Sequence, residues 1–410
     1  MSRQRTILVL AVASQAAVAT ISFGLPAIAI QIRSALDIGP AGFGAVYAAP
    51  GIGSALMLIP AGMLVDRLGA RRVLIAGGAV NCAGDVLAGL AHSPWLFAAG
   101  LLIGGAGGAA VPVAGMTSLL REFTPAQRGI ALGWRQLAVP LGGTIGSIAL
   151  PALVSTGGVR LALISMGIAA GIAAAAFSTV CDDSPSATVP SRGLDGVLSV
   201  PGMRTLIACG VLYAWALGGI LTYYTSAARH EGLTAGMAAI GFTVLNLTAA
   251  GARLVWGRLA DREDGTRRVH SLRNTGILAA IAAVSLPFAL GAGTAPAMVA
   301  TAAVSFGIFG FNGVFYLIAG ELAGEARAGR AVGIASTVVF GFSSLASPVA
   351  GLFIESTGYG SVWVIGAITA GLGAVAASRV PRRGYSGMAQ VVQTRITTAV
   401  PPGRAQRPGP

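Results

Sequence analysis

The sequence predicts an all-α membrane protein with twelve transmembrane helices, arranged as two halves of six. Of its 410 residues, 54% are hydrophobic and only 10% are charged, and the mean hydropathy is +0.77. A soluble domain carries about 25% charged residues, so a polytopic membrane protein is expected. Twelve apolar runs are long enough to cross a bilayer, which takes about 20 residues per helix. A charged turn in the first half recurs about half a chain later, which indicates two related halves.

The first six apolar runs make up the N-terminal half. A basic start precedes the first run, which continues to Ile30 and is therefore expected to be an uncleaved helix rather than a signal peptide. Short turns with charged residues or proline separate the runs. The fifth run contains Pro140, which leaves a helix carbonyl without its usual backbone donor. The expected spans are residues 6–30, 42–64, 73–91, 95–120, 129–154 and 159–180.

A polar break over residues 181–202 interrupts the apolar pattern near the middle of the chain and is expected to be a cytoplasmic linker. It separates the N-terminal half, residues 1–180, from a C-terminal half over residues 203–379. Residues 380–410 are rich in proline, glycine and arginine, a composition typical of a disordered tail. The expected spans of the second half are residues 203–227, 236–259, 274–290, 295–320, 330–354 and 361–378.

The positive charge of the chain is expected to set its topology. Every basic residue except histidine is arginine, and the net charge is +13. In a soluble protein this charge would suggest a nucleic-acid partner. Here the arginines gather in short loops between alternate pairs of runs, where they would face anionic lipid headgroups on the cytoplasmic side. We therefore expect a protein of the inner or plasma membrane with both termini cytoplasmic, the bilayer as its partner, no nucleic acid and no obligatory protein partner.

The two charged turns carry a family resemblance. Residues 62–72 read GMLVDRLGARR, and a weaker copy, one residue longer, reads GRLADREDGTRR over residues 257–268. The first pattern resembles the signature loop between the second and third helices of the major facilitator superfamily. A turn that only sets topology is the alternative, but recurrence at half-chain distance favours the family. The matching residues are Gly62, Asp66, Arg67, Gly69 and Arg71 in the first turn and Gly257, Asp261 and Arg262 in the second.

This resemblance, which covers about residues 6–379, implies two six-helix bundles around a central cavity that opens alternately to each side. It also implies a substrate site near the bilayer midplane, between the halves. In the family, the signature-loop charges help to hold the outward-open state. Arg253 lies one turn before Gly257 and is expected to join this network near the inner surface rather than to bind substrate.

Two departures from the family weaken a drug-export interpretation. Many members carry an arginine in the fourth helix, near the place where this chain has Gly100. Many drug–proton antiporters carry G-P-x-x-G-G in the fifth helix, whereas residues 139–143 read VPLGG here. Neither departure excludes drug efflux.

Two charged residues lie inside expected spans and could take part in transport. Arg135 is about two turns into the fifth span, where a guanidinium in a central cavity would suit a carboxylate; a structural ion pair or snorkelling is the alternative. Asp85 is about two-thirds of the way across the third span and could bind and release a proton; a wetted or locally partnered carboxyl is the alternative. Further possible cavity polar residues, each also explicable as a helix contact or interface anchor, are Gln15, Asn246, Asn312, Tyr223 and Tyr224.

The functional prediction is a secondary active transporter that moves a small solute, possibly an organic anion, by alternating access with protons. Drug or metabolite efflux by proton antiport is the alternative. No lysine is present, so a nucleotide-binding loop ending in G-K-[ST] is excluded. The three cysteines and three histidines are scattered, so we expect neither a cofactor nor a metal, and no enzyme. A non-transporting sensor would need an output domain that neither linker nor tail could supply.

Overall fold

The computed structural model describes residues 3–182, 195–261, 265–324 and 328–381. Across these residues all regular secondary structure is helical. Most of the predicted linker and the predicted tail after Pro381 lie outside the described residues, as does Arg262 of the second charged turn. The helices confirm the predicted all-α class.

The predicted twelve spans fit the helices, although the described residues contain eleven helical stretches that are long and apolar enough to cross a membrane. The difference arises in α7 (Pro125–Ser178), a 54-residue helix that holds two spans. Gly157 and Gly158 break it, because Gly158 has φ 70° and ψ −176°, a conformation that glycine adopts without steric cost. The chain crosses the bilayer, turns at these two glycines and crosses back.

The other N-terminal spans are formed by helices of different lengths, and two of them are broken. The first span begins in α1, passes through a short 3-10 helix, η1, that contains Pro26, and ends in α2. The fourth span is divided at Ala109, because Pro112 lacks the N–H that would donate the next backbone hydrogen bond of the helix. The bounds are α1 Arg3–Gly24, η1 Leu25–Ile28, α2 Ala29–Leu36, α3 Pro40–Leu68, α4 Ala70–Leu90, α5 Pro94–Gly108 and α6 Ala110–Glu122.

The C-terminal half repeats this plan after the short helix α8 (Asp195–Leu198). Its tenth span is divided at Phe309 and Gly310, about 200 residues after the break at Ala109. The Trp256 indole N–H donates to the Phe306 carbonyl beside this break, at 3.1 Å. The bounds are α9 Met203–His230, α10 Ala235–Asp261, α11 Gly265–Gly291, α12 Thr294–Ile308, α13 Phe311–Ala323, α14 Ala328–Ser343, α15 Ala346–Thr357 and α16 Gly360–Ser378.

The predicted start of the ninth span is displaced furthest. The ninth span was expected from residue 274, but α11 already begins at Gly265. Its first turns carry arginines and are polar, so hydropathy alone does not reveal them, yet they continue the same helix beyond the apolar segment. The charged turn before α11 is correspondingly shorter than expected.

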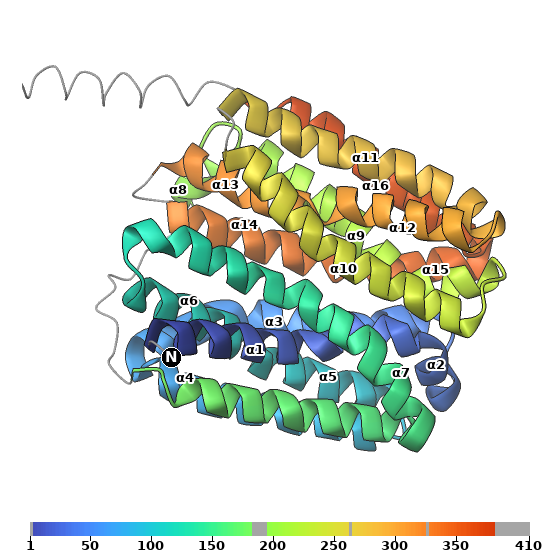
Figure 1. Cartoon of the computed structure of the whole chain (residues 1–410), viewed down its shortest axis with the longest axis horizontal. Coiled ribbons are helices and arrows are strands. Elements are labelled where there is room, and N and C mark those ends of the chain that lie inside the picture. The colour runs from blue at the N-terminus through green and yellow to red at the C-terminus, as the bar shows by residue number, and fades with distance from the viewer. Residues whose placement is uncertain (1–2, 183–194, 262–264, 325–327, 382–410) are drawn as a thin grey trace, which may run out of the picture.

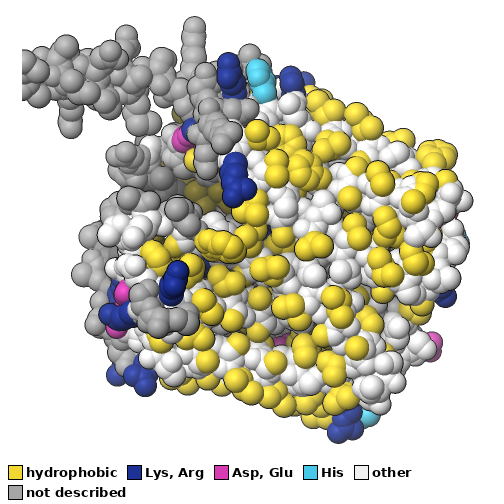
Figure 2. All heavy atoms as spheres, in the orientation of Figure 1, with side chains coloured by type: hydrophobic (Ala, Val, Ile, Leu, Met, Phe, Trp, Pro, Cys, Tyr) yellow, Lys and Arg dark blue, Asp and Glu magenta, His cyan; other side chains and the backbone are white. Residues whose placement is uncertain are grey.

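The helices run back and forth between two ends of the molecule. We call one end the basic face, where α1 begins, α16 ends and the first charged turn lies. It carries Arg3, Arg67, Arg121 and Arg268 and lies at the left of Figure 1. The other end we call the opposite face. Between them, large apolar side chains point outward, such as Phe288, 75% exposed, and Val299, 70% exposed. Figure 2 shows this hydrophobic band, which suits contact with lipid tails.

The helices form two groups that lie side by side. In Figure 1, α1–α7 occupy the lower group and α9–α16 the upper one. Within the lower group, α4 and α5 approach closely because small residues face each other. A Cβ on Gly84 would meet the backbone of Gly100 and Gly104, so only glycine fits. Such close contacts replace the hydrophobic driving force that is missing between helices in a bilayer.

We predict that Gly84→Ala destabilises the N-terminal half, because the new methyl group forces α4 and α5 apart. Overpacking of this kind costs about 1–3 kcal/mol. The matched control is Gly251→Ala in α10, where a Cβ would meet nothing within 4 Å. Thermal melting in detergent, followed by size-exclusion chromatography, measures both. Equal melting temperatures for the two variants would contradict the packing account.

Candidate functional site

The two groups of helices meet along α7 and α10, which run antiparallel. The Ser147 hydroxyl lies 2.8 Å from the Thr243 hydroxyl, and Asn246 packs directly against Gly143. Nearer the basic face, Arg253 Nη1 donates to the Gln136 carbonyl at 2.8 Å. We call this line of contacts the central seam.

Arg253 is the charged group on the central seam. Its side chain leaves α10, in the C-terminal half, and reaches α7 in the N-terminal half. Its Nε is buried and has no hydrogen-bond partner among the described residues. Tyr316 of α13 lies close enough to interact with it electrostatically. Arg253 therefore contacts the other half directly, which differs from its expected place in the charged-turn network.

Arg135 lies deeper inside the N-terminal half. It is 8% exposed, and its Nη2 donates to the Pro112 carbonyl of α6 at 2.9 Å. Gly115 and Phe177 lie beside its side chain. The guanidinium is thus turned toward α6 rather than toward α10. Within the described residues, neither Arg135 nor Arg253 forms an ion pair with a carboxylate.

Asp85 is buried away from the central seam. It is 3% exposed and lies where α4, α5 and the second span of α7 meet. Asn81 Nδ2 donates to its Oδ2 at 3.0 Å and to the Gly104 carbonyl at 2.9 Å. Gly104 and Gly167 provide the space for this side chain, because a Cβ on Gly104 would lie 2.6 Å from its Oδ1 and a Cβ on Gly167 would lie 2.6 Å from its Cβ. This carboxyl is held entirely by helices of one half.

The predicted cavity amides lie on three different spans. The Gln15 Oε1 atom of α1 is buried without a partner among the described residues. Asn246 is 1% exposed; its Nδ2 donates to the Phe242 carbonyl at 3.0 Å, while its Oδ1 faces Gly143 without a hydrogen bond. Asn312 donates to the Phe309 carbonyl at the break in the tenth span, at 3.4 Å. Ala16, which follows Gln15 on α1, packs against Gly142 of α7, and Asn246 packs against the adjacent Gly143.

Tyr223, predicted as a cavity residue, lies in a second contact between the halves near the opposite face. Its hydroxyl bonds to the Pro40 carbonyl at 2.7 Å and to the Ser347 carbonyl at 2.9 Å. Gly44 and Gly351 make room for it between α3 and α15. Tyr224, by contrast, bonds to Thr301 at 2.7 Å within the C-terminal half.

Two further contacts join the halves beside Tyr223. Arg33 Nη1 donates to the Tyr359 hydroxyl at 2.8 Å, and the Ala41 backbone N–H donates to Glu355 Oε1 at 2.9 Å. Sequence reasoning missed both, because Arg33 and Glu355 are only isolated charges near loops. We call the contacts made by Tyr223, Arg33 and Glu355 the opposite-face lock.

The first charged turn lies at the basic face, between α3 and α4. Gly69 has φ 84°, and its N–H donates to the Val65 carbonyl at 3.0 Å, so it ends α3 in a left-handed conformation. Gly62 and Asp66 are half-buried on the last turns of α3, whereas Arg67 and Arg71 are exposed. In the second turn, Gly257 is half-buried on α10, and Asp261 is its last residue. Arg268, at the start of α11, forms an ion pair with Glu321 and donates to the Ala260 carbonyl at 2.8 Å.

Packing between the halves is looser at the basic face. Gly51 of α3 meets Ser344 beside the middle of the molecule. Further toward the basic face, a Cβ on Gly333 or Gly341 of α14, or on Gly133 of α7, would meet nothing within 4 Å. The contacts between the halves named here thus lie at the opposite face and along the central seam.

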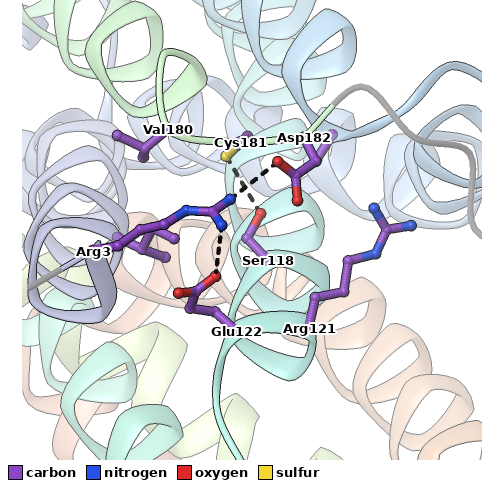
Figure 3. A pocket seen from close by; sticks show the side chains of 9 residues that line it. Arg3, Ser118, Arg121, Glu122, Val180, Cys181 and Asp182 are labelled. Atoms are coloured by element: carbon purple, nitrogen blue, oxygen red, sulfur yellow. Dashed lines mark hydrogen bonds and ion pairs between the residues drawn. The ribbon is translucent and has the colours of Figure 1, made fainter.

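A small polar pocket lies at the basic face within the N-terminal half (Figure 3). Arg3 bridges the ends of the fourth and sixth spans, with 3.1 Å to Asp182 and 3.7 Å to Glu122. The Cys181 thiol lies 3.3 Å from the Ser118 hydroxyl. The pocket joins helices of one half only, so it is separate from the central seam.

This pocket predicts slow alkylation of Cys181. Burial, with a smaller contribution from nearby Asp182, raises the pKa of its thiol, which the Ser118 hydrogen bond only partly opposes. The reactive thiolate is therefore scarce at neutral pH, and its fraction rises as the pH increases. In a variant without Cys82 and Cys209, maleimide labelling followed by mass spectrometry should be at least about tenfold slower in the native protein than after unfolding. Equal labelling rates in the native and the unfolded protein would contradict a buried Cys181 thiol.

Comparisons with known proteins agree with this architecture. Residues 8–348 match the model of the Major Facilitator Superfamily. An uncharacterized MFS-type transporter found in two strains of Mycobacterium tuberculosis is 27% identical over 332 residues, covering 78% of this chain and 73% of the relative.

Solved structures share the fold at low identity. A D-xylose-proton symporter has a TM-score of 0.76 at 14% identity, covering 93% of this chain and 99% of that one. A mutant of the nucleoside transporter NupG has a TM-score of 0.71 at 15% identity, covering 92% of this chain and 98% of that one. The third structure is a bacterial homolog of the human lysosomal transporter Spinster in an inward-facing and unoccupied conformation. It has a TM-score of 0.70 at 15% identity, covering 98% of this chain and 100% of that one. The chain thus belongs to the major facilitator superfamily, as its charged turns indicate, and is a multi-pass membrane transporter rather than an enzyme.

Proposed function

We propose that this transporter moves a small organic anion through the central seam by alternating access, coupled to protons. The observation that carries the proposal is Arg253, which reaches from one half to the other and whose buried Nε has no hydrogen-bond partner in the part of the chain that the structure describes. A ligand held by this group would contact both halves at once. Its binding could then bias the exchange between the two access states, because only differential contacts can shift such an equilibrium.

The positive charge of Arg253 on the central seam favours an anionic substrate. A guanidinium inside a membrane protein is costly unless a partner compensates it. Arg253 has only a backbone carbonyl as a hydrogen-bond acceptor among the described residues. A carboxylate could accept from the free Nε and a neighbouring amino group in the paired geometry that arginine favours. A cationic substrate would instead meet an uncompensated positive charge.

The remaining polar residues take secondary roles in this proposal. Arg135 adds a second positive charge from inside the N-terminal half. Gln15 and Asn246, on either side of the glycine pair of α7, orient the substrate at the midplane, and Asn312 supports the break in the tenth span. Asp85 is retained as a proton acceptor within the N-terminal half.

The basic face is proposed to be cytoplasmic, in the inner or plasma membrane. Arg3, Arg67, Arg121 and Arg268 lie there, and positively charged loops remain on the cytoplasmic side of membrane proteins. We also propose that the N-terminal half, which ends at residue 180, and the C-terminal half, which begins at residue 203, each move as a bundle.

Uptake into proteoliposomes with an imposed proton gradient tests the substrate class. A panel of carboxylates is compared with cationic dyes for the wild type, Arg253→Gln, Arg253→Lys and Arg135→Gln. Arg253→Gln should raise the carboxylate concentration for half-maximal uptake by about 10- to 100-fold, because hydrogen bonds to charged groups contribute about 1.5–3 kcal/mol. Arg253→Lys should weaken carboxylate uptake less, since lysine keeps the positive charge but lacks the planar guanidinium that forms two parallel hydrogen bonds.

Arg135→Gln serves as the matched control, because its guanidinium is turned toward Pro112. We expect a smaller effect on uptake than from Arg253→Gln. If Arg135→Gln abolishes carboxylate uptake and Arg253→Gln does not, the substrate contacts Arg135 instead. If dyes move and both arginine variants transport them normally, the anion proposal fails and drug efflux by proton antiport replaces it.

A further inference from the structure

The opposite-face lock contains a carboxylate from one half that binds the start of a helix in the other. Glu355 of α15 accepts from the Ala41 N–H of α3 at 2.9 Å. Pro40, the first residue of α3, has no N–H, so Ala41 provides the first backbone donor of this helix. A helix N-terminus carries partial positive charge and stabilises an adjacent carboxylate. The Glu355 carboxylate therefore forms one of the bonds between the two halves.

The carboxylate lies within a small group of polar side chains. Tyr223 of α9 interacts electrostatically with Glu355, Arg33 and Tyr359. Arg33 of α2 donates to the Tyr359 hydroxyl, and the His230 ring packs on Tyr359 with ring centroids 5.1 Å apart. The exposed Asp37 lies in the connection that leads to α3. Among these groups, Glu355 is the carboxylate bonded to the backbone of the other half.

Glu355 is also accessible to protons. Its side chain is exposed at the opposite face, so it exchanges protons with the water on that side. A protonated glutamic acid has no charge to interact with the α3 N-terminus and is a poorer acceptor for Ala41. The bond across the halves weakens as a result, while Tyr223 and Arg33 remain in place.

We propose that Glu355 is a proton-binding site that controls opening of the opposite face. When ionised, it stabilises the closed lock; when protonated from the opposite side, it favours separation of α3 from α15. This site is distinct from Asp85, which is enclosed by helices of the N-terminal half and touches no contact between the halves. It would allow a proton gradient to bias the access states directly. The inference depends on alternating access but not on the chemical nature of the substrate.

Distance measurements between spin labels test the proposal without any substrate. Cysteines are introduced at Ser34 of α2 and Ala235 of α10, both exposed at the opposite face in different halves, after Cys82, Cys181 and Cys209 are replaced. The protein is reconstituted in nanodiscs. Its distance distribution is then recorded as the pH falls from about 7.5 to about 4.5, the range in which exposed carboxylates take up protons.

In the wild-type background, acidification should increase the population with the longer distance. Glu355→Gln should already show this population at neutral pH, with the open-to-closed ratio raised about two- to fivefold, the size expected for a charge at an exposed helix N-terminus. It should respond little to further acidification. Glu231→Gln, which removes another carboxylate at the opposite face, should behave like the wild type.

Three results would overturn the proposal: no response of the wild type to pH, a closed and wild-type-like distribution in Glu355→Gln at neutral pH, or an unchanged pH response in that variant. The last result would assign the pH response to another group at the opposite face. Size-exclusion chromatography of each variant establishes that the protein is folded. Failure of anion transport would leave the outcome of this experiment unaffected.

Discussion

The two halves of this membrane protein must bind each other without a hydrophobic driving force between them, and the rest of the structure depends on this constraint. Lipid tails are as apolar as the helices, so contact must come from close packing of small residues and from polar bonds. Gly143 on α7 and Gly44 and Gly351 on α3 and α15 allow Asn246 and Tyr223 to approach the other half. These contacts lie at the middle and at the opposite face, so the halves can part from the basic face while remaining joined elsewhere.

This constraint also explains why the two arginines within the membrane-spanning helices α7 and α10 differ. Arg135 bonds to a carbonyl within its own half, so its position changes little if the halves move as bodies. Arg253 bonds to a carbonyl of the other half, so that bond must break when the central seam opens. An anion that replaces the lost acceptor would keep the guanidinium compensated during the movement. The same reasoning gives Glu355 its importance, because its partner also belongs to the other half.

Much of the architecture could be predicted from the sequence because a bilayer accepts few solutions. Each crossing needs a long apolar helix, so hydropathy predicts the twelve spans, and the repeated charged turn indicates the family. Hydropathy does not report which face of a helix meets which neighbour. For that reason the sequence does not reveal that Tyr223 and Arg253 contact the other half, and it gives no sign of the Arg33 and Glu355 contacts.

Direct binding of a carboxylate to the purified protein tests the central claim, that Arg253 leaves an uncompensated positive charge between the halves. Calorimetric titration of a small carboxylate panel into the wild type and Arg253→Gln, each in detergent at low salt, gives the affinity without transport. The account predicts measurable binding to the wild type and a loss of about tenfold or more in the variant. Binding of equal strength to both proteins, or of cations in preference to carboxylates, would contradict it.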